Sequence, residues 1–189
     1  KPQPDCGFIF LNGEFMEIKN NVFVVTGAAR GLGFEIARDL ATWGGKLALI
    51  DMDEEVLDQS ATALSEHGTE IRTYIVNVAN EAEVVVAFNR IQEDFGQIND
   101  LVNNAGITRD ALLVKRKDGV TKKMSFVDWK MVIDVNLTGV FLCGREAAAK
   151  MLENGIKGVI VVSGIAEPSS MLTVTPSSGM SSPLTAETR

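Results

Sequence analysis

Residues 26–33 read Thr-Gly-Ala-Ala-Arg-Gly-Leu-Gly and directly follow a short apolar run, Val22 to Val25. A helical pattern begins immediately behind them, over residues 31–43. Glycines let a backbone turn sharply and approach an anion, and the free N–H groups at a helix N-terminus attract phosphate. A glycine turn placed between a strand and a helix therefore favours a pyrophosphate-binding site over a plain connection.

The same alternation of apolar runs and amphipathic stretches continues along the chain. It predicts strands at 22–26, 46–51, 71–78, 98–103 and 158–163, and helices at 31–43, 54–67, 81–95 and 128–154. Strands separated by helices of this length require right-handed crossovers and a parallel sheet covered on both faces. We therefore predict an α/β fold, a Rossmann-type doubly wound parallel sheet that is truncated after its fifth strand.

The two ends of the chain lack the alternating pattern of the middle. Residues 1–15 show no regular pattern and Met16 directly precedes the first regular segment, so 1–15 is predicted to be a leader that is disordered or not native. Residues 16–166 form the predicted dinucleotide-binding domain. Residues 167–189 are rich in Ser, Thr and Pro and are predicted to be a flexible tail that replaces lost sequence.

The amino-acid composition argues against nucleic acid, membranes and metal ions as binding partners. The chain of 189 residues has 18 Lys and Arg against 25 Asp and Glu, for a net charge of −7, so it has no general attraction for nucleic acid. It has no apolar run of the ~18 residues needed to cross a bilayer. Two cysteines and one histidine lack metal-ligand spacing, so no metal site is predicted. We expect a cytoplasmic protein without nucleic-acid or membrane partners.

An acidic residue points to the type of dinucleotide. Asp51 ends the second predicted strand 18 residues after Gly33, close to the ~20 typical of an acid that binds the ribose hydroxyls. Its carboxylate would repel the 2′-phosphate of NADP, whereas Arg30 in the glycine turn could hold that phosphate. Because Asp51 would lie against the ribose itself, NAD is the predicted cofactor and NADP is less favoured.

These residues resemble the short-chain dehydrogenase/reductase family. The spacing Thr-Gly-x-x-x-Gly-x-Gly at 26–33 is similar to that family's cofactor motif, 77–78 to its adenine-binding pair, and Asn-Asn-Ala-Gly at 103–106 to the motif that lines the cofactor and steadies the sheet. The glycine turn and the resemblance together predict a set of cofactor-binding residues: Gly27, Arg30, Gly31, Leu32, Gly33, Asp51, Met52, Asn77, Val78, Asn103, Ala105 and Gly106.

The resemblance also implies catalytic residues. Asn136 would hold a water in the proton relay, although taken alone it could equally be a buried structural side chain. Ser163 is either the catalytic hydroxyl or the neighbour of that position. The family's Tyr-x-x-x-Lys motif has no counterpart, since the only tyrosine is Tyr74 and no lysine follows Lys157. Without that pair we expect the chain to bind cofactor better than it turns over substrate.

The stretch 104–110, Asn-Ala-Gly-Ile-Thr-Arg-Asp, resembles the 3-oxoacyl-[acyl-carrier-protein] reductase and acetoacetyl-CoA reductase branch. This implies hydride transfer between nicotinamide and a carbonyl or secondary alcohol, with a 3-oxoacyl thioester as candidate substrate. A non-catalytic dinucleotide-binding protein is the main alternative, and a Rossmann-like methyltransferase would leave 103–106 unexplained.

Two expectations concern surfaces. Residues 115–117 and 122–123 are basic and fit a solvated loop better than a docking site for an acidic carrier or a CoA phosphate. By resemblance, a homo-oligomer, either tetramer or dimer, is expected if the C-terminal region of the family is present.

Overall fold

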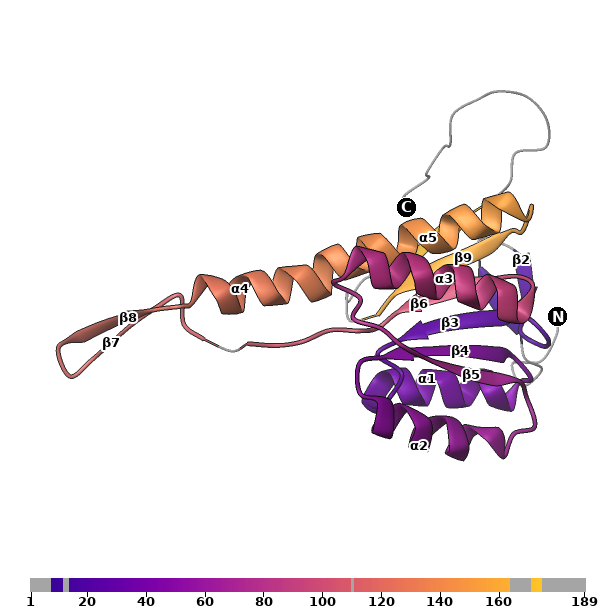
Figure 1. Cartoon of the computed structure of the whole chain (residues 1–189), viewed down its shortest axis with the longest axis horizontal. Coiled ribbons are helices and arrows are strands. Elements are labelled where there is room, and N and C mark those ends of the chain that lie inside the picture. Colours follow the sequence, from indigo (N-terminus) through magenta and orange to yellow (C-terminus); the bar gives the residue numbers. More distant parts are fainter. Residues whose placement is uncertain (1–7, 12–13, 110, 164–170, 175–189) are drawn as a thin grey trace, which may run out of the picture.

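The computed structural model describes residues 8–11, 14–109, 111–163 and 171–174. A six-stranded sheet runs through its centre (Figure 1), in the order β10-β9-β6-β3-β4-β5. Five of these strands are mutually parallel and β10 pairs antiparallel with β9. Their bounds are β3 Val22–Thr26, β4 Lys46–Asp51, β5 Ile71–Ile75, β6 Asp100–Asn103, β9 Gly158–Val162 and β10 Met171–Val174.

Helices cover the sheet on both sides (Figure 1). The helices α1 Gly31–Thr42 and α2 Glu54–Ser65 pack on one face, and α3 Glu81–Phe95 and α5 Val140–Glu153 pack on the other. The helix α4 Phe126–Ile133 and the π-helix η1 Asp134–Gly139 lead into α5 and extend away from the sheet. The predicted doubly wound parallel sheet is thereby confirmed.

The core divides into two apolar layers because successive strand residues point to opposite faces. On β3, Val24 packs into the layer beneath α3 and α5, while its neighbours Phe23 and Val25 pack into the layer beneath α1 and α2. Ala48 and Leu49 of β4 alternate in the same way. Strands buried on both faces must be apolar throughout, which is why they read as continuous apolar runs in the sequence.

The strand order reverses between β3 and β6. From β3 the chain moves outward through β4 to β5, and then returns to place β6 and β9 on the other side of β3. The connections that leave β3 and β6 therefore diverge to opposite faces, and their carboxyl ends border a crevice. In open α/β sheets, ligands bind at this switch point.

Several predicted boundaries need correction. The third strand ends at Ile75 and not at residue 78, because Asn77 and Asn80 divert the backbone into the turn that starts α3. The fourth strand begins at Asp100. The long helix begins at Phe126, two residues before its predicted start, and η1 interrupts its α-helical hydrogen bonding.

The expectation that the two ends lack regular structure is also corrected. The strands β1 Phe8–Leu11 and β2 Glu14–Glu17 form an antiparallel hairpin, and β10 extends the sheet beyond its fifth parallel strand. These strands have four residues each, which is too short for an alternating pattern to stand out among polar neighbours. The rest of the predicted leader and tail, residues 1–7, 12–13, 167–170 and 175–189, lies outside the described residues.

The basic stretch is solvated, as expected, but it forms a hairpin and not an irregular loop. Strands β7 Val114–Lys117 and β8 Val120–Lys123 pair antiparallel and project away from the sheet (Figure 1). Asp118 and Gly119 join them, both with positive φ, as a two-residue type I′ turn requires.

A buried carboxyl group in the sheet gives stability a pH dependence. Asp100 on β6 is 4% exposed, and its Oδ1 accepts a 2.9 Å hydrogen bond from the Val159 N–H. Its Oδ2 has no partner among the described residues. Burial raises the pKa of Asp100 to about 7, and the Val159 hydrogen bond offsets this only in part. The folded chain therefore holds a proton on Asp100 where the unfolded chain has lost it.

We predict that the free energy of unfolding falls as pH rises from about 4 to about 7, because the folded state binds the extra proton over that window. Asp100→Asn keeps an acceptor for Val159 and does not ionise, so this fall should shrink by on the order of 2–4 kcal/mol. Urea unfolding at four pH values in that window, with both proteins, measures the difference. Parallel pH profiles for the two proteins would contradict the assignment.

Candidate cofactor site

The glycine turn between β3 and α1 is closely packed, and side chains would block it. Gly27 has a φ of +66°, and a Cβ there would lie 2.8 Å from the Cα of Ala105. A Cβ on Gly33 would lie 2.2 Å from the Gly27 carbonyl oxygen. Gly31, with a φ of +60°, has open space where its side chain would be. Two glycines thus bring α1 against the strand ends, and the third leaves room above the turn for a ligand.

The N-terminus of α1 faces that space without a side-chain cap. Arg30 is its N-cap residue, and its side chain, which has no acceptor atom, makes no capping hydrogen bond. The first N–H groups of a helix have no partner within the helix, and they carry the positive end of its dipole. A pyrophosphate placed over Gly31 would meet these donors. Leu32, the next residue in the chain, is 59% exposed.

Backbone donors hold the Asp51 carboxylate at the end of β4. Its Oδ2 accepts the Ala29 N–H at 3.1 Å, and its Oδ1 accepts the N–H groups of Met52 at 2.7 Å and Asp53 at 3.2 Å. The carboxylate is thereby tied to the glycine turn across the gap between β3 and β4. Arg30 forms an ion pair with Asp53, so its guanidinium is directed to a carboxylate beside the predicted ribose site.

The ends of β3 and β6 are joined by one hydroxyl. Thr26 Oγ1 accepts the N–H groups of Asn104 and Ala105, each at 3.0 Å. The Asn104 side chain in turn donates through Nδ2 to the Gly27 carbonyl at 3.1 Å. These bonds fix the start of the Asn-Asn-Ala-Gly stretch against the glycine turn, and the role of Ala105 toward a cofactor remains a prediction. The preceding Asn103 is buried in β6, with no partner for its Nδ2 among the described residues.

Ser163 extends this set of contacts to the next strand. Its hydroxyl donates to Asn104 Oδ1 at 2.9 Å, and its backbone N–H donates to the Asn103 carbonyl at 2.9 Å. The structure therefore brings Ser163 to the crevice edge, where the carboxyl ends of β3, β6 and β9 meet. Its neighbour Gly164, the alternative catalytic position, lies outside the described residues.

Asn136 lies on the π-helix η1 and is fixed through both ends of its amide. Its Oδ1 accepts the Ile107 N–H at 2.8 Å, and its Nδ2 donates to the Ile107 carbonyl at 2.9 Å. Gly106 lies directly beneath, since a Cβ there would be 3.5 Å from Asn136 Oδ1. Asn136 thus binds the loop that leaves β6. A π-turn inside an α-helix is found frequently at functional sites.

The predicted adenine pair lies in the turn after β5. Asn77 donates its N–H to Glu83 and accepts the Ala79 N–H through its side chain, so it shapes the start of α3. Val78 is buried, and a Cβ on Gly139 of η1 would lie 2.9 Å from its Cγ2. This close approach sets the π-helix against the turn after β5. The roles of Asn77, Val78 and Met52 toward a cofactor remain predictions.

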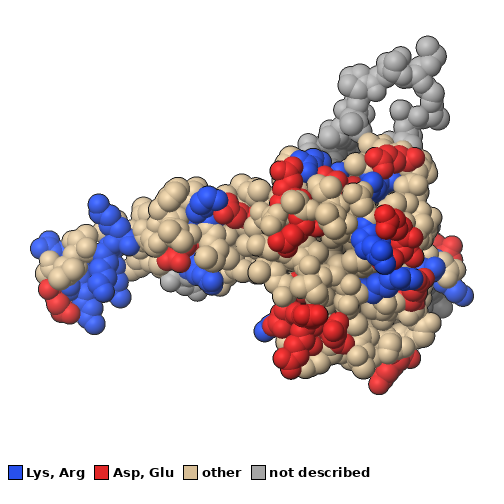
Figure 2. Space-filling view, viewed as in Figure 1, with Lys and Arg blue, Asp and Glu red and all other residues tan. Residues whose placement is uncertain are grey.

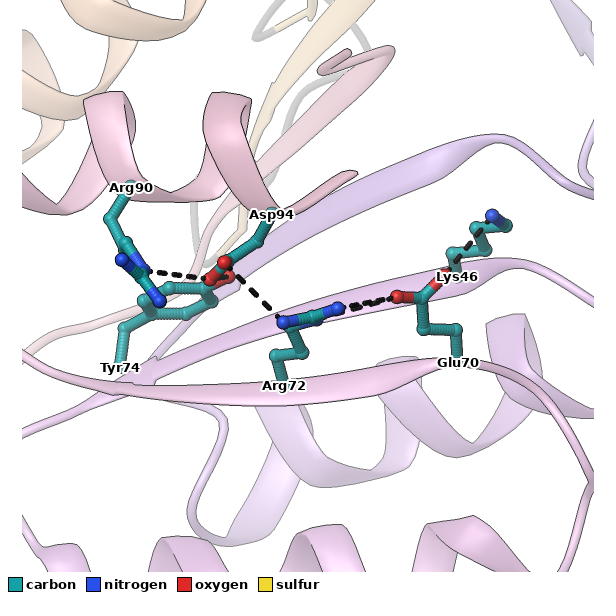
Figure 3. A network of polar contacts seen from close by, with 6 residues as sticks. All are labelled: Lys46, Glu70, Arg72, Tyr74, Arg90 and Asp94. Atoms are coloured by element: carbon teal, nitrogen blue, oxygen red, sulfur yellow. Dashed lines mark hydrogen bonds and ion pairs between the residues drawn. The ribbon is translucent and has the colours of Figure 1, made fainter. Parts of the chain in front are cut away.

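The only tyrosine takes no part in this site. Tyr74 lies on the edge strand β5 and donates its hydroxyl to Asp94 at 2.9 Å (Figure 3). Burial, and then the hydrogen bond with Asp94, raise the pKa of Tyr74 well above its ordinary value. Asp94 also pairs with Arg72 and Arg90, which makes this a structural network. A phenol held in this way does not donate protons readily near neutral pH.

Two kinds of feature are absent from the described part of the chain. No group of three or more His, Cys, Asp and Glu side chains there could hold a metal ion. None of the helices described is long and apolar enough to cross a membrane.

We predict that Thr26→Val lowers the free energy of unfolding by about 1–3 kcal/mol. The substitution keeps the side-chain volume and removes the acceptor for two half-buried backbone N–H groups. Thermal and urea unfolding measure the loss. Thr42→Val is a suitable control, because the Thr42 hydroxyl only bonds within an exposed helix. An equal, small effect of both substitutions would show that the Thr26 hydroxyl does not hold the two strands together.

Comparison with known proteins adds to this geometry. A family model described as short chain dehydrogenase matches residues 21–181. The chain is 37% identical over 146 residues to a 3-oxoacyl-[acyl-carrier-protein] reductase of Synechocystis, and the match covers 77% of this chain and 56% of that protein.

Solved structures agree with the fold. NAD+-bound xylitol dehydrogenase matches 82% of this chain and 58% of its own, with a TM-score of 0.67 and 29% identity. An alcohol dehydrogenase from Thermococcus sibiricus in complex with 5-hydroxy-NADP matches 75% of this chain and 57% of its own, with a TM-score of 0.65 and 30% identity. The chain spans little more than half the length of the proteins that it matches.

Proposed function

The chain belongs to the short-chain dehydrogenase family, and from that premise we propose that it binds NAD in the crevice between the ends of β3 and β6. The glycine turn would take the pyrophosphate, and Asp51 would take the ribose hydroxyls. The observation that carries this proposal is the Asp51 carboxylate, held by three backbone N–H groups beside the open space above Gly31.

Charge supports NAD over NADP. A fixed carboxylate at the ribose repels a 2′-phosphate, and its oxygens can accept from the ribose hydroxyls. Arg30 would have to leave Asp53 before it could compensate. Relatives of known structure include complexes with NAD+ and with an NADP derivative, so the preference rests on these side chains of the chain itself.

We predict that Asp51→Asn weakens NADH binding roughly tenfold or more, because a hydrogen bond to a charged acceptor is lost. The affinity for NADPH should stay constant or rise, because the repulsion is gone. Fluorescence titration with the two nucleotides measures both changes. Glu54→Gln is the matched control, since it removes a neighbouring carboxylate from the first turn of α2. Equal losses for the two nucleotides would contradict a ribose contact by Asp51.

For the whole protein we propose an oxidoreductase that acts on a carbonyl or secondary alcohol, with a 3-oxoacyl thioester as candidate substrate. Bound nicotinamide would supply the hydride. Asn136, fixed to the Ile107 backbone, would position a water for the proton relay, and the Ser163 hydroxyl would hold the substrate oxygen. The stretch 104–110 and the Synechocystis relative support the thioester. A cytoplasmic setting remains a prediction.

A second candidate is dinucleotide binding without catalysis. The observation that favours it is Tyr74, which is the only tyrosine in the sequence and is bound to Asp94 away from Asn136 and Ser163. A proton relay made of Asn136, a water and Ser163 alone has no group that readily gives a proton to the substrate oxygen near neutral pH.

We predict that this chain binds NADH and does not oxidise it with an acetoacetyl thioester. Titration by NADH fluorescence, followed by absorbance at the nicotinamide band with the thioester added, separates the two candidates. Binding without turnover supports the second candidate for this chain. Turnover that survives in Tyr74→Phe and is lost in Asn136→Ala would establish catalysis through the crevice. Tight binding of S-adenosylmethionine in place of NADH would contradict both.

A further inference from the structure

The hairpin β7–β8 projects away from the sheet into solvent. Its two strands pair only with each other, and residues 111–123 are exposed throughout. Figure 1 shows the hairpin continuing outward beyond α4. A 3.0 Å hydrogen bond from the Met124 N–H to the Leu113 carbonyl closes its base. We call residues 114–123 the arm.

The arm is basic although the chain is acidic. It contains five of the 18 Lys and Arg and one of the 25 Asp and Glu, so it carries +4, while the remainder, with 13 basic and 24 acidic residues, carries −11. Figure 2 shows these cations gathered at the end of the projection. None of them pairs with an acidic side chain within the described part of the chain. The net charge of the whole chain, which argues against nucleic acid, therefore does not describe this surface.

Both faces of the arm carry cations. Residues directly opposite each other across two strands lie on the same face, and successive residues of a strand lie on opposite faces. The register of the two strands therefore places on one face Lys115, Lys117, Val120 and Lys122. The other face holds Val114, Arg116, Thr121 and Lys123. With three cations on one face and two on the other, the arm has no apolar face.

Repulsion between these cations disfavours the arm in isolation. Lys115 and Lys122 lie directly opposite each other, and like charges at such positions destabilise a strand pair. Isolated two-stranded hairpins are at best marginally stable in water. The turn is well formed, since Asp118 and Gly119 both have positive φ. Anionic groups placed along both faces would therefore stabilise the arm.

We infer that the arm binds duplex DNA, with its turn inserted into the major groove. This groove is about 12 Å wide and about 8.5 Å deep, and it admits a two-stranded β-ribbon. Phosphates border it on both sides, so each face of the ribbon meets one row of them. A lipid surface or a flat acidic protein surface meets one face alone. The charge on both faces of the arm therefore favours a groove.

The length of the arm fits that groove. At about 3.3 Å per residue, Lys115 and Lys122 lie roughly 10 Å behind the turn, level with the phosphates at the rim when the turn reaches the floor. Asp118 then faces the base edges, where every base pair offers an amino group as a donor. The arm has no Asn or Gln and its contacts are mostly with phosphates, so binding does not depend on base sequence.

The reach of the arm limits repulsion between the DNA and the acidic remainder of the chain. The four residues of β7 and the turn extend roughly 15 Å at about 3.3 Å per residue, and α4 adds further separation from the sheet (Figure 1). Charges further apart than about 8 Å are largely screened at physiological salt. The inference depends neither on the cofactor nor on the reaction.

The test is fluorescence anisotropy of a labelled DNA duplex of about 20 base pairs, titrated with the full chain at about 20, 60 and 150 mM salt. Five phosphate contacts predict that the logarithm of the affinity falls with the logarithm of the salt concentration, with a slope between about −3 and −5. Substitution on either face, K115E/K122E or R116E/K123E, should weaken binding at least tenfold at about 60 mM salt. The control K19E/R38E changes the net charge equally, away from the arm, and should leave the affinity within about threefold.

A variant of the turn tests shape separately from charge. Gly119→Val keeps all five cations, and its Cβ would meet no neighbouring atom, but a β-branched residue strongly disfavours the φ of +77°. This substitution should weaken duplex binding at least threefold. Thermal unfolding of every arm variant should match the parent, because no residue of the arm is buried.

Four results would each overturn the inference. They are no binding of the duplex by about 100 µM protein at about 20 mM salt, a loss in only one of the two face variants, parental affinity in Gly119→Val, and a single strand of equal length bound as tightly as the duplex. Vesicles of phosphatidylserine and phosphatidylcholine serve as the flat anionic surface for comparison. Binding of the vesicles without binding of the duplex would make the arm a membrane contact instead.

Discussion

The hydroxyl of Thr26 is the contact on which the crevice depends. At the point where the strand order reverses, the connections after β3 and β6 leave toward opposite faces of the sheet, and nothing in the ladder itself holds them together. Thr26 Oγ1 takes the N–H groups of Asn104 and Ala105, which would otherwise be left without partners at the strand end. The crevice therefore has defined walls before any ligand enters.

Close backbone contacts, together with the Thr26 hydroxyl, hold the walls of the crevice in place. Gly27 and Gly33 leave no space for a Cβ, so α1, the glycine turn and the loop after β6 meet main chain to main chain. Hydrogen bonds from Asn104 to Gly27 and from Ser163 to Asn104 continue the contact to β9. A site built from backbone and short side chains has few rotamers to order, which lowers the entropy lost when a ligand binds.

Much of this could be predicted from sequence because each feature has a local signal. The buried strands β3 and β4 stand out as apolar runs that end in turn residues, and their bounds were predicted to the residue. The Thr-Gly motif and Asp51 were predicted from their spacing. Asn77 and Asn80, in contrast, end β5 early because their side chains compete with the ladder for backbone N–H groups, and the apolar Val78 between them concealed that turn.

Other features had signals that were missed or no local signal at all. The Asp-Gly pair at 118–119 is a strong indication of a two-residue hairpin turn, and the charged residues on either side of it obscured that signal. The π-helix at Asn136 has the composition of an ordinary helix. It forms at the place where Gly139 meets Val78 and Asn136 binds Ile107, and all of these are contacts between distant segments. The role of Tyr74 likewise depends on Asp94, which is 20 residues away in the sequence.

The described molecule thus has two parts that differ in how they are stabilised. The sheet and its four covering helices bury two apolar layers, and at the free edge β5 the charged chain from Lys46 through Glu70 and Arg72 to Asp94 ties the strand to α3 (Figure 3). Charged side chains along an edge strand also discourage pairing with another sheet. The hairpin β7–β8 and α4 contain no buried residue, and the ion pair between Lys130 and Asp134 lies exposed on the surface. Short helices without packing and isolated two-stranded hairpins are only marginally stable, so the stability of the described molecule comes from the sheet and its covering helices and not from the hairpin β7–β8 and α4.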